Sequence, residues 1–182
     1  DVNRHGVLNA RASNGILKIR VAPYIVNTLS DVDCLKEQLD AGAAYLDYGS
    51  GGGDMLMQVA EGKTDIESLH GLDISPYAVE TAQENVENAG LSNRINFQQG
   101  SIRDLNALSD MRDAVGTDKV VASINFILHD VGPEMSRIFL SNHAIMFGDS
   151  PLVITESSKM PPEILKAYPN YQAPTFEFMH KA

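Results

Sequence analysis

From Tyr45 onward, apolar runs of strand length alternate with amphipathic stretches of helix length. This alternation is typical of β-α-β units, in which parallel strands form one sheet and helices cover its two faces. The expected strands are Ala43–Tyr48, Ser68–Ile74, Ile95–Gln98, Lys119–Phe126 and Leu152–Glu156. The fourth run is almost continuously apolar, as expected of a central strand that is buried on both faces. The chain is therefore predicted to have an α/β fold with a mostly parallel sheet.

The clearest helix signal spans Pro76–Ala89. Ser75 can cap its start, proline suits the first helical position, and Gly90 suits a left-handed C-terminal cap. Its apolar residues recur at helical spacing and are expected to face the core; they are Val79, Ala82, Val86 and Ala89.

The other connections also have helical character. Asp54–Glu61 is expected to form a helix entered from a glycine-rich loop, and Pro133–Phe147 a helix that ends at Gly148. A further helix is expected between the third and fourth strands. The inward side chains of the last helix are predicted to be Met135, Ile138, Phe139, Ile145 and Met146.

The two ends of the chain differ from its centre. Residues 1–42 contain helical stretches at Ala22–Leu29 and Asp31–Leu39 but no strong strand, and we interpret them as a helical cover or lid. Residues 43–182 are then the ligand-binding core. Its last part is rich in proline and irregular after a short expected helix at Glu163–Ala167.

Composition excludes several classes of protein. The 182 residues carry a net charge of −10 without a basic patch, which argues against a nucleic-acid partner. No run is long enough to span a membrane, and no signal-peptide pattern is present. The single cysteine, Cys34, is compatible with a cytoplasmic location and is expected to be a small core residue. Because the first residue is Asp1 rather than Met, we expect the sequence to be part of a longer product. The sequence pattern does not indicate an oligomeric state.

The stretch "YLDYGSGGGD" places a glycine-rich loop directly after the first expected strand. Ligands of open α/β sheets bind at this end of the strands. Gly49, Gly51 and Gly53 permit positive φ and a close approach of a ligand to the backbone amides, and the following helix directs its N-terminal N–H groups at the same space. Asp73, at the end of the next strand, can accept hydrogen bonds from both hydroxyls of a ribose. The alternatives that involve no ligand are that the glycine loop is only a tight turn and that Asp73 is a surface or capping residue.

Two classes of cofactor share this arrangement. The dinucleotide pattern G-x-G-x-x-G requires glycine at position 54, which is Asp54 in this chain. The pattern present is G-x-G-x-G preceded by Asp47, and it resembles motif I of the class I S-adenosyl-L-methionine-dependent methyltransferases, which have a Rossmann-like fold. The resemblance covers about residues 45–156. It implies that the loop holds the amino-acid part of the cofactor and that the acid after the second strand holds its ribose. The cofactor-binding residues that follow are Asp47, Gly49, Ser50, Gly51, Gly53, Asp73 and the adjacent Ile74.

The adenine contact of that family follows the third strand. There, Gly100 is followed by Ser101, where the family commonly has an acidic residue. This departure removes the acidic contact to the adenine, but Ser101 can still hydrogen-bond there, and Ile102 is expected to pack on the ring face. Asp104 is either a replacement acid or the residue that starts the next helix, and we favour the second interpretation.

The stretch after the fourth strand, "INFILHDVGPE", resembles the small-molecule O-methyltransferases, which carry I-L-H-D-W there; Val131 replaces the tryptophan. The resemblance implies that His129 is the general base and that Glu156 orients it. Asp130 is expected to shape the loop or the cofactor side of the pocket. A histidine with a pKa near neutrality suits removal of a hydroxyl proton. Asn125 is included among the residues of the cofactor site. An amide that holds an amine acceptor is an alternative, but the proline pair of that motif is missing, which favours a structural role.

These features predict methyl transfer to a small organic acceptor, at a hydroxyl or an acidified carbon. One alternative is a module of a larger synthase whose acceptor is bound to a carrier protein, and another is a non-catalytic domain of the same fold that binds the cofactor or an interaction partner. No metal is expected, although histidines and an aspartate could converge; they are His70, His129, Asp130, His143 and His180. Few residues follow Glu156, so we expect the sixth and seventh strands of that fold to be missing or to lie in residues beyond those of this sequence, unless "TFEFMHK" begins one.

Overall fold

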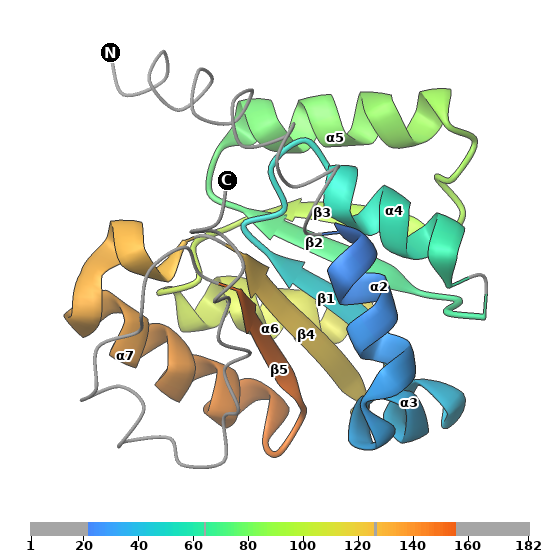
Figure 1. The fold of residues 1–182 in the computed structure, drawn as a ribbon. Helices are drawn as coiled ribbons and strands as arrows, with labels where there is room; N and C mark the ends of the chain where they lie inside the picture. Colours follow the sequence, from blue (N-terminus) through green and yellow to red (C-terminus); the bar gives the residue numbers. More distant parts are fainter. Residues whose placement is uncertain (1–21, 64, 126, 156–182) are drawn as a thin grey trace, which may run out of the picture.

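The computed structural model describes residues 22–63, 65–125 and 127–155, and the side chains of His129 and Asp130 are outside that description. Helices and strands alternate in the expected order, as Figure 1 shows. The elements are α2 (Ala22–Asp31), α3 (Asp33–Asp40), β1 (Ala44–Tyr48), α4 (Asp54–Gly62), β2 (Leu69–Asp73), α5 (Pro76–Asn88), β3 (Ile95–Gln99), α6 (Leu105–Val115), β4 (Val120–Asn125), α7 (Leu128–Phe147) and β5 (Leu152–Thr155).

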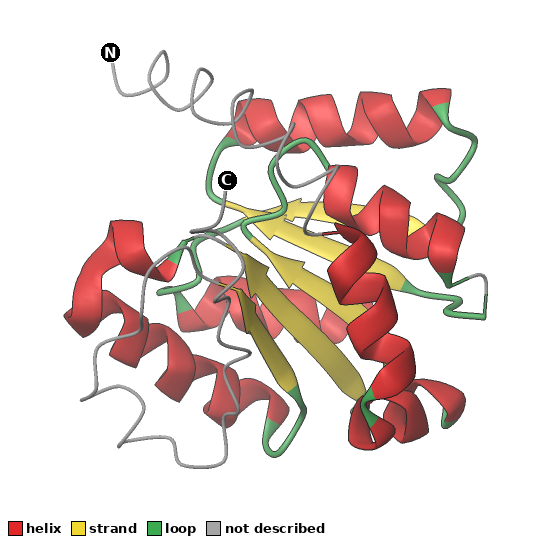
Figure 2. Ribbon diagram, in the orientation of Figure 1, coloured by secondary structure: helices red, strands yellow, loops and turns green. Residues whose placement is uncertain are grey.

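The five strands form one parallel sheet in the order β3-β2-β1-β4-β5 (Figure 2). The order reverses between β1 and β4, because the chain first adds strands on one side of β1 and then crosses to the other. A crevice outside the carboxyl ends of the strands forms at such a reversal, and this is where open α/β sheets bind ligands.

Helices cover both faces of the sheet, and each layer has its own apolar core. Tyr45 and Val121 lie in the core beneath α2, α3 and α4, whereas Leu46 and Ile124 lie in the core shared with α6 and α7. The residue alternation along each strand produces this division, since successive side chains point to opposite faces. The expected parallel α/β architecture is confirmed. No helix in the described part of the chain is long and apolar enough to cross a membrane.

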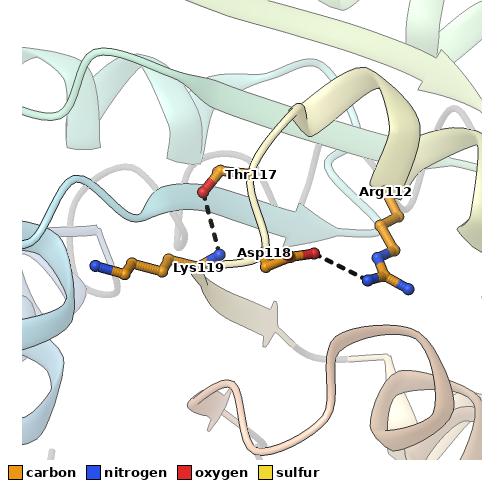
Figure 3. A network of polar contacts seen from close by, with 4 residues as sticks. All are labelled: Arg112, Thr117, Asp118 and Lys119. Atoms are coloured by element: carbon orange, nitrogen blue, oxygen red, sulfur yellow. Dashed lines mark hydrogen bonds and ion pairs between the residues drawn. The ribbon is translucent and has the colours of Figure 1, made fainter.

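The turn from α6 into β4 is built from local polar contacts (Figure 3). Gly116 ends α6 with φ +69°, and the backbone N–H of Lys119 then donates to the Thr117 hydroxyl at 3.2 Å. Arg112 and Asp118 form an ion pair at 2.9 Å on the surface. The sequence predicted a helix in this place without its bounds.

Most differences from the expected elements are one-residue shifts at their ends, but α7 is a larger exception. It begins at Leu128 rather than Pro133, and a kink at Gly132 (φ +78°, ψ +171°) separates its first turn from the rest. A glycine in this conformation interrupts the helix without ending it, and Pro133 then occupies the first position of the second segment.

Four side chains expected in the core are exposed instead. Ile138 and Ile145 of α7 are 38% and 63% exposed, because the inward face of the helix is formed by Phe139, Leu140 and Phe147. Ala89 caps the end of α5 and is exposed. Cys34 is also exposed, since α3 buries Leu35 and Leu39, four residues apart, on its other side. The short helix expected at Glu163–Ala167 lies outside the described residues.

Candidate active site

The glycine loop after β1 is a tight turn tied to the neighbouring strand. Gly49, Gly51 and Gly53 have φ values of +70°, +52° and +82°, so each needs the conformational freedom that the sequence suggested. The backbone N–H of Gly49 donates to the Leu72 carbonyl of β2 at 2.6 Å. A Cβ on Gly51 would meet no atom within 4 Å, whereas one on Gly49 would lie 1.7 Å from Cδ1 of Ile127. Open space therefore exists at the middle of the loop, where a ligand is expected.

Asp73 connects this loop to the start of α5. One carboxylate oxygen accepts the Gly51 N–H at 2.9 Å, and the other accepts the Ser75 N–H, also at 2.9 Å. The side chain is half-buried and borders a cavity. Each carboxylate oxygen has a further lone pair, so Asp73 keeps capacity for the ribose hydroxyls that the sequence analysis assigns to it.

A cavity of about 340 Å³ opens at the carboxyl ends of β1, β2 and β3. This volume lies at the lower end of the range of ligand pockets. Its walls are mostly apolar, with Asp73, Ser101 and Arg103 as the polar side chains. The other lining residues are Gly49, Leu72, Ile74, Gly100, Ile102, Ile127, Val131 and Met135.

Six of the residues predicted to bind the cofactor therefore meet around one cavity. They are Gly49, Asp73, Ile74, Gly100, Ser101 and Ile102. Sequence reasoning did not assign Arg103, Ile127, Val131 and Met135 to this site. The last three come from the start of α7 and the residue before it. The apolar character of Ile127 and Val131 on either side of "LHD" was the available signal, but the expected helix began too late to use it.

Asp47 and Asn125 do not line the cavity; they belong to a buried polar cluster below the glycine loop. The hydroxyl of Ser123 and the amide of Asn125 both donate to one oxygen of Asp47, at 2.6 and 3.0 Å. Tyr45 in turn donates to Ser123 at 2.8 Å. Register explains the cluster, because Asp47 lies opposite Ser123 in the parallel pairing of β1 and β4. Burial raises the pKa of the Asp47 carboxyl to about 7, although both donors act in the opposite direction.

Three buried polar atoms near this end of the sheet have no hydrogen-bond partner among the described residues. They are the hydroxyls of Ser50 and Thr155 and the side-chain oxygen of Asn125. Asn125 and Thr155 lie opposite each other on β4 and β5. A buried polar atom without a partner is costly, so each of these three requires a partner that is not among the described residues, such as a ligand, a water or a residue outside the description.

The family model of the methyltransferase domain matches residues 39–170, which is most of the chain and contains the loop, the cavity and the polar cluster. The chain belongs to this methyltransferase domain family. Its membership implies a methyl donor of the S-adenosyl-L-methionine type. A search of curated proteins found no match.

Solved structures support the fold of this methyltransferase domain. An O-methyltransferase family protein from Burkholderia thailandensis superposes with a TM-score of 0.58 at 17% identity, over 87% of this chain and 46% of its own. The methyltransferase domain of bacterial CtHen1 gives 0.54 at 18% identity, over 74% of this chain and 63% of its own. The mitomycin 7-O-methyltransferase MmcR gives 0.50 at 19% identity, over 78% and 46%. The chain thus spans about half the length of two of these neighbours.

The residues predicted for catalysis are placed only in part. His129 and Asp130 lie in the first turn of α7, between Ile127 and Val131, both of which line the cavity. Their backbone positions are thus next to the cavity wall, and the role of His129 stays a prediction. Glu156 lies outside the described residues, so its role as the orienting carboxylate also stays a prediction.

The two other described histidines have structural partners. His143 of α7 is fully buried, and its Nδ1 lies 2.9 Å from the Tyr48 hydroxyl; burial lowers its pKa to about 4. His70 lies on β2 with its Nε2 2.8 Å from the Ser68 hydroxyl, and burial lowers its pKa as well. In the described part of the chain, no three metal-ligating side chains come together. His180 is outside that part, so the absence of a metal site stays a prediction.

Proposed function

We propose that this domain binds S-adenosyl-L-methionine and transfers its methyl group to a small organic acceptor, at a hydroxyl or an acidified carbon. The observation that supports this proposal most directly is the cavity at the carboxyl ends of β1–β3, where the glycine loop, Asp73 and Ile102 meet. Open space at Gly51 and an apolar cavity with one carboxylate suit a nucleoside with a zwitterionic tail. When bound, this cofactor supplies an electrophilic methyl group on a sulfonium.

Each part of the cavity then has a role in binding. The carboxylate of Asp73 receives the ribose hydroxyls, and Ile74, Ile102 and Ile127 enclose the adenosine between apolar surfaces. The backbone amides of the glycine loop, together with the N-terminus of α4 at Asp54, hold the carboxylate of the methionine part. Catalysis by such a site depends mainly on the proximity and orientation of the two reactants.

His129 is proposed to remove the proton of the acceptor, with Glu156 as the group that orients its ring. The proposal is supported by the place of His129 in the first turn of α7, beside residues that line the cavity. Oxygen as the atom that receives the methyl group is favoured because two of the structural neighbours are named as O-methyltransferases. Binding of the acceptor on a carrier protein is compatible with the same chemistry.

Calorimetry with S-adenosyl-L-methionine and S-adenosyl-L-homocysteine tests the first part of the proposal. The wild-type chain is expected to bind both. Asp73→Asn keeps the size of the side chain but removes its charge and one acceptor oxygen, and it should weaken binding about ten- to a hundredfold. Asp113→Asn, an exposed position on α6, is the matched control and should bind like the wild type.

The second part is tested by transfer of a labelled methyl group to an identified acceptor. His129→Ala should bind S-adenosyl-L-homocysteine normally and lose transfer. Unchanged transfer would show that His129 is not the base. Cofactor binding without transfer to any acceptor by the wild type would favour the non-catalytic alternative, and the absence of cofactor binding would contradict the proposal altogether.

A further inference from the structure

The loop that joins β3 to α6 forms one wall of the cavity through Ser101, Ile102 and Arg103. Its internal hydrogen bonds are short-range. The Asp104 N–H donates to the Ser101 carbonyl at 3.0 Å, and the Arg103 N–H donates to the Ser101 hydroxyl at 3.3 Å. These contacts define the shape of the turn. They do not fix its distance from the opposite wall, which Ile127 and Met135 provide.

Besides an exposed contact of the Arg103 guanidinium with the sulfur of Met135 at 3.7 Å, Asn142 supplies that connection from the middle of α7. Its side-chain amide donates to the Arg103 carbonyl at 3.0 Å and, more weakly, approaches the Ile102 carbonyl at 3.5 Å. The residue is only 7% exposed, so water competes little for these carbonyls. Both acceptors are backbone atoms of residues whose side chains face the cavity, and a shift of either would move the wall itself.

The helix that carries Asn142 is anchored to the sheet on both sides of this residue. Phe139 packs edge-on against Tyr48 with ring centroids 4.9 Å apart, and the neighbouring His143 meets the hydroxyl of the same tyrosine. Tyr48 directly precedes the glycine loop in β1. The amide of Asn142 is therefore held at a fixed place relative to the loop on the other side of the cavity.

From this geometry we infer that Asn142 is a positioning residue for cofactor binding, which fixes the adenine-side wall of the cavity against the glycine loop. The inference rests on the proposed function. Asn142 touches no ligand in this arrangement; it acts through the carbonyls of Ile102 and Arg103. A site whose walls are held in place before binding loses less conformational freedom when the ligand enters, and this raises affinity.

The test compares Asn142→Asp with the wild type. Aspartate has the same shape but places carboxylate oxygens against the carbonyl oxygens of Ile102 and Arg103, so the attraction between residue 142 and the loop becomes a repulsion. We expect the dissociation constant for S-adenosyl-L-homocysteine to rise at least about tenfold, and hydrogen exchange at the amides of residues 101–104 to become faster. Asn106→Asp, at an exposed position on α6, is the matched control and should change neither. Asn142→Gln, which keeps the donor, should recover part of the affinity.

The outcomes separate this inference from the proposed function. If the wild type fails to bind S-adenosyl-L-homocysteine, the proposed function is wrong. If the wild type binds and Asn142→Asp binds equally well, Asn142 does not position the site. A lower melting temperature with unchanged affinity and exchange at residues 101–104 would likewise assign it a structural role only. Should Asn142→Asp fail to fold, Asn142→Ser, which is smaller and uncharged, carries the same comparison.

Discussion

Gly49 and Gly90 share one backbone conformation but have different surroundings. Both have φ +70°, a value that L-residues with a side chain adopt at a cost of about 1–2 kcal/mol. A Cβ on Gly90 would meet nothing within 4 Å, whereas one on Gly49 would collide with Ile127. Substitutions at these two positions therefore distinguish the effect of backbone strain from the effect of a steric clash.

We expect Gly90→Ala to lower stability by about 1–2 kcal/mol and to leave cofactor binding unchanged. Gly49→Ala should incur the same strain and, in addition, displace Ile127, which lines the cavity. Its affinity for S-adenosyl-L-homocysteine should fall by about tenfold or more. Thermal melts and calorimetry on the two variants check this. Equal affinities would show that Ile127 can move without affecting the site.

A buried hydroxyl connects the first turn of α7 to the rest of the helix. Ser136 is 1% exposed, and its Oγ lies 2.8 Å from the Gly132 carbonyl and 3.2 Å from the Leu128 carbonyl, to one of which it donates at a time. These carbonyls are at the kink and at the start of the turn that contains His129. Since the kink interrupts the regular hydrogen bonds of the helix, this hydroxyl stabilises the orientation of the turn.

Ser136→Ala is expected to loosen that turn without unfolding the domain. Hydrogen exchange in residues 128–131 should become faster, and methyl transfer should slow by up to about tenfold, which corresponds to the loss of one net hydrogen bond. Affinity for S-adenosyl-L-homocysteine should change less than the transfer rate. Ser109→Ala, exposed on α6, is the control. Normal exchange and transfer in the Ser136 variant would show that the kinked turn is held by other contacts.

The kink also explains why α7 was the least well predicted element. Gly132 and Pro133 together indicate the boundary between a loop and a helix, whereas the structure has a helical turn before them, from Leu128, which the non-helical φ and ψ of Gly132 separate from the rest. The exposed Ile138 and Ile145 have a similar cause. Several apolar stripes are possible on a helix this rich in apolar residues, and the packing of Phe139 against Tyr48 selects one of them.

The sheet was predictable because local signals agree with one another along the chain. The Ser75 hydroxyl accepts the Ala78 N–H at 3.3 Å as its capping role requires, and all five strands lie within two residues of the expected ranges. The polar cluster was not predictable, because it depends on register. Tyr45, Asp47 and Ser123 meet only once β1 and β4 pair, and a shift of one residue would separate them.

Two buried groups give the whole molecule opposing responses to pH. Asp47 has a native pKa of about 7, above its ordinary value of 3.8, so between about pH 4 and 7 the native state binds a proton that the unfolded state has lost. Stability from this group therefore falls as pH rises. His143 has a native pKa of about 4, below its ordinary 6.5, so between these values the unfolded state binds the extra proton and stability rises with pH.

Because the two effects oppose each other from about pH 4 to 6.5, the stability of the wild type should change little with pH. The contribution of Asp47 is visible only in the difference in stability between a variant and the wild type. Asp47→Asn keeps an oxygen that can accept from Ser123 and Asn125 and removes the titration. Relative to the wild type, the free energy of unfolding of this variant should increase steadily from pH 4 to pH 7, as measured by urea denaturation without cofactor. Asp113→Asn, at an exposed position on α6, should follow the wild type at every pH. A difference between Asp47→Asn and the wild type that does not change with pH would mean that Asp47 is already ionised in the native protein at low pH, and that its two hydrogen-bond donors outweigh its burial.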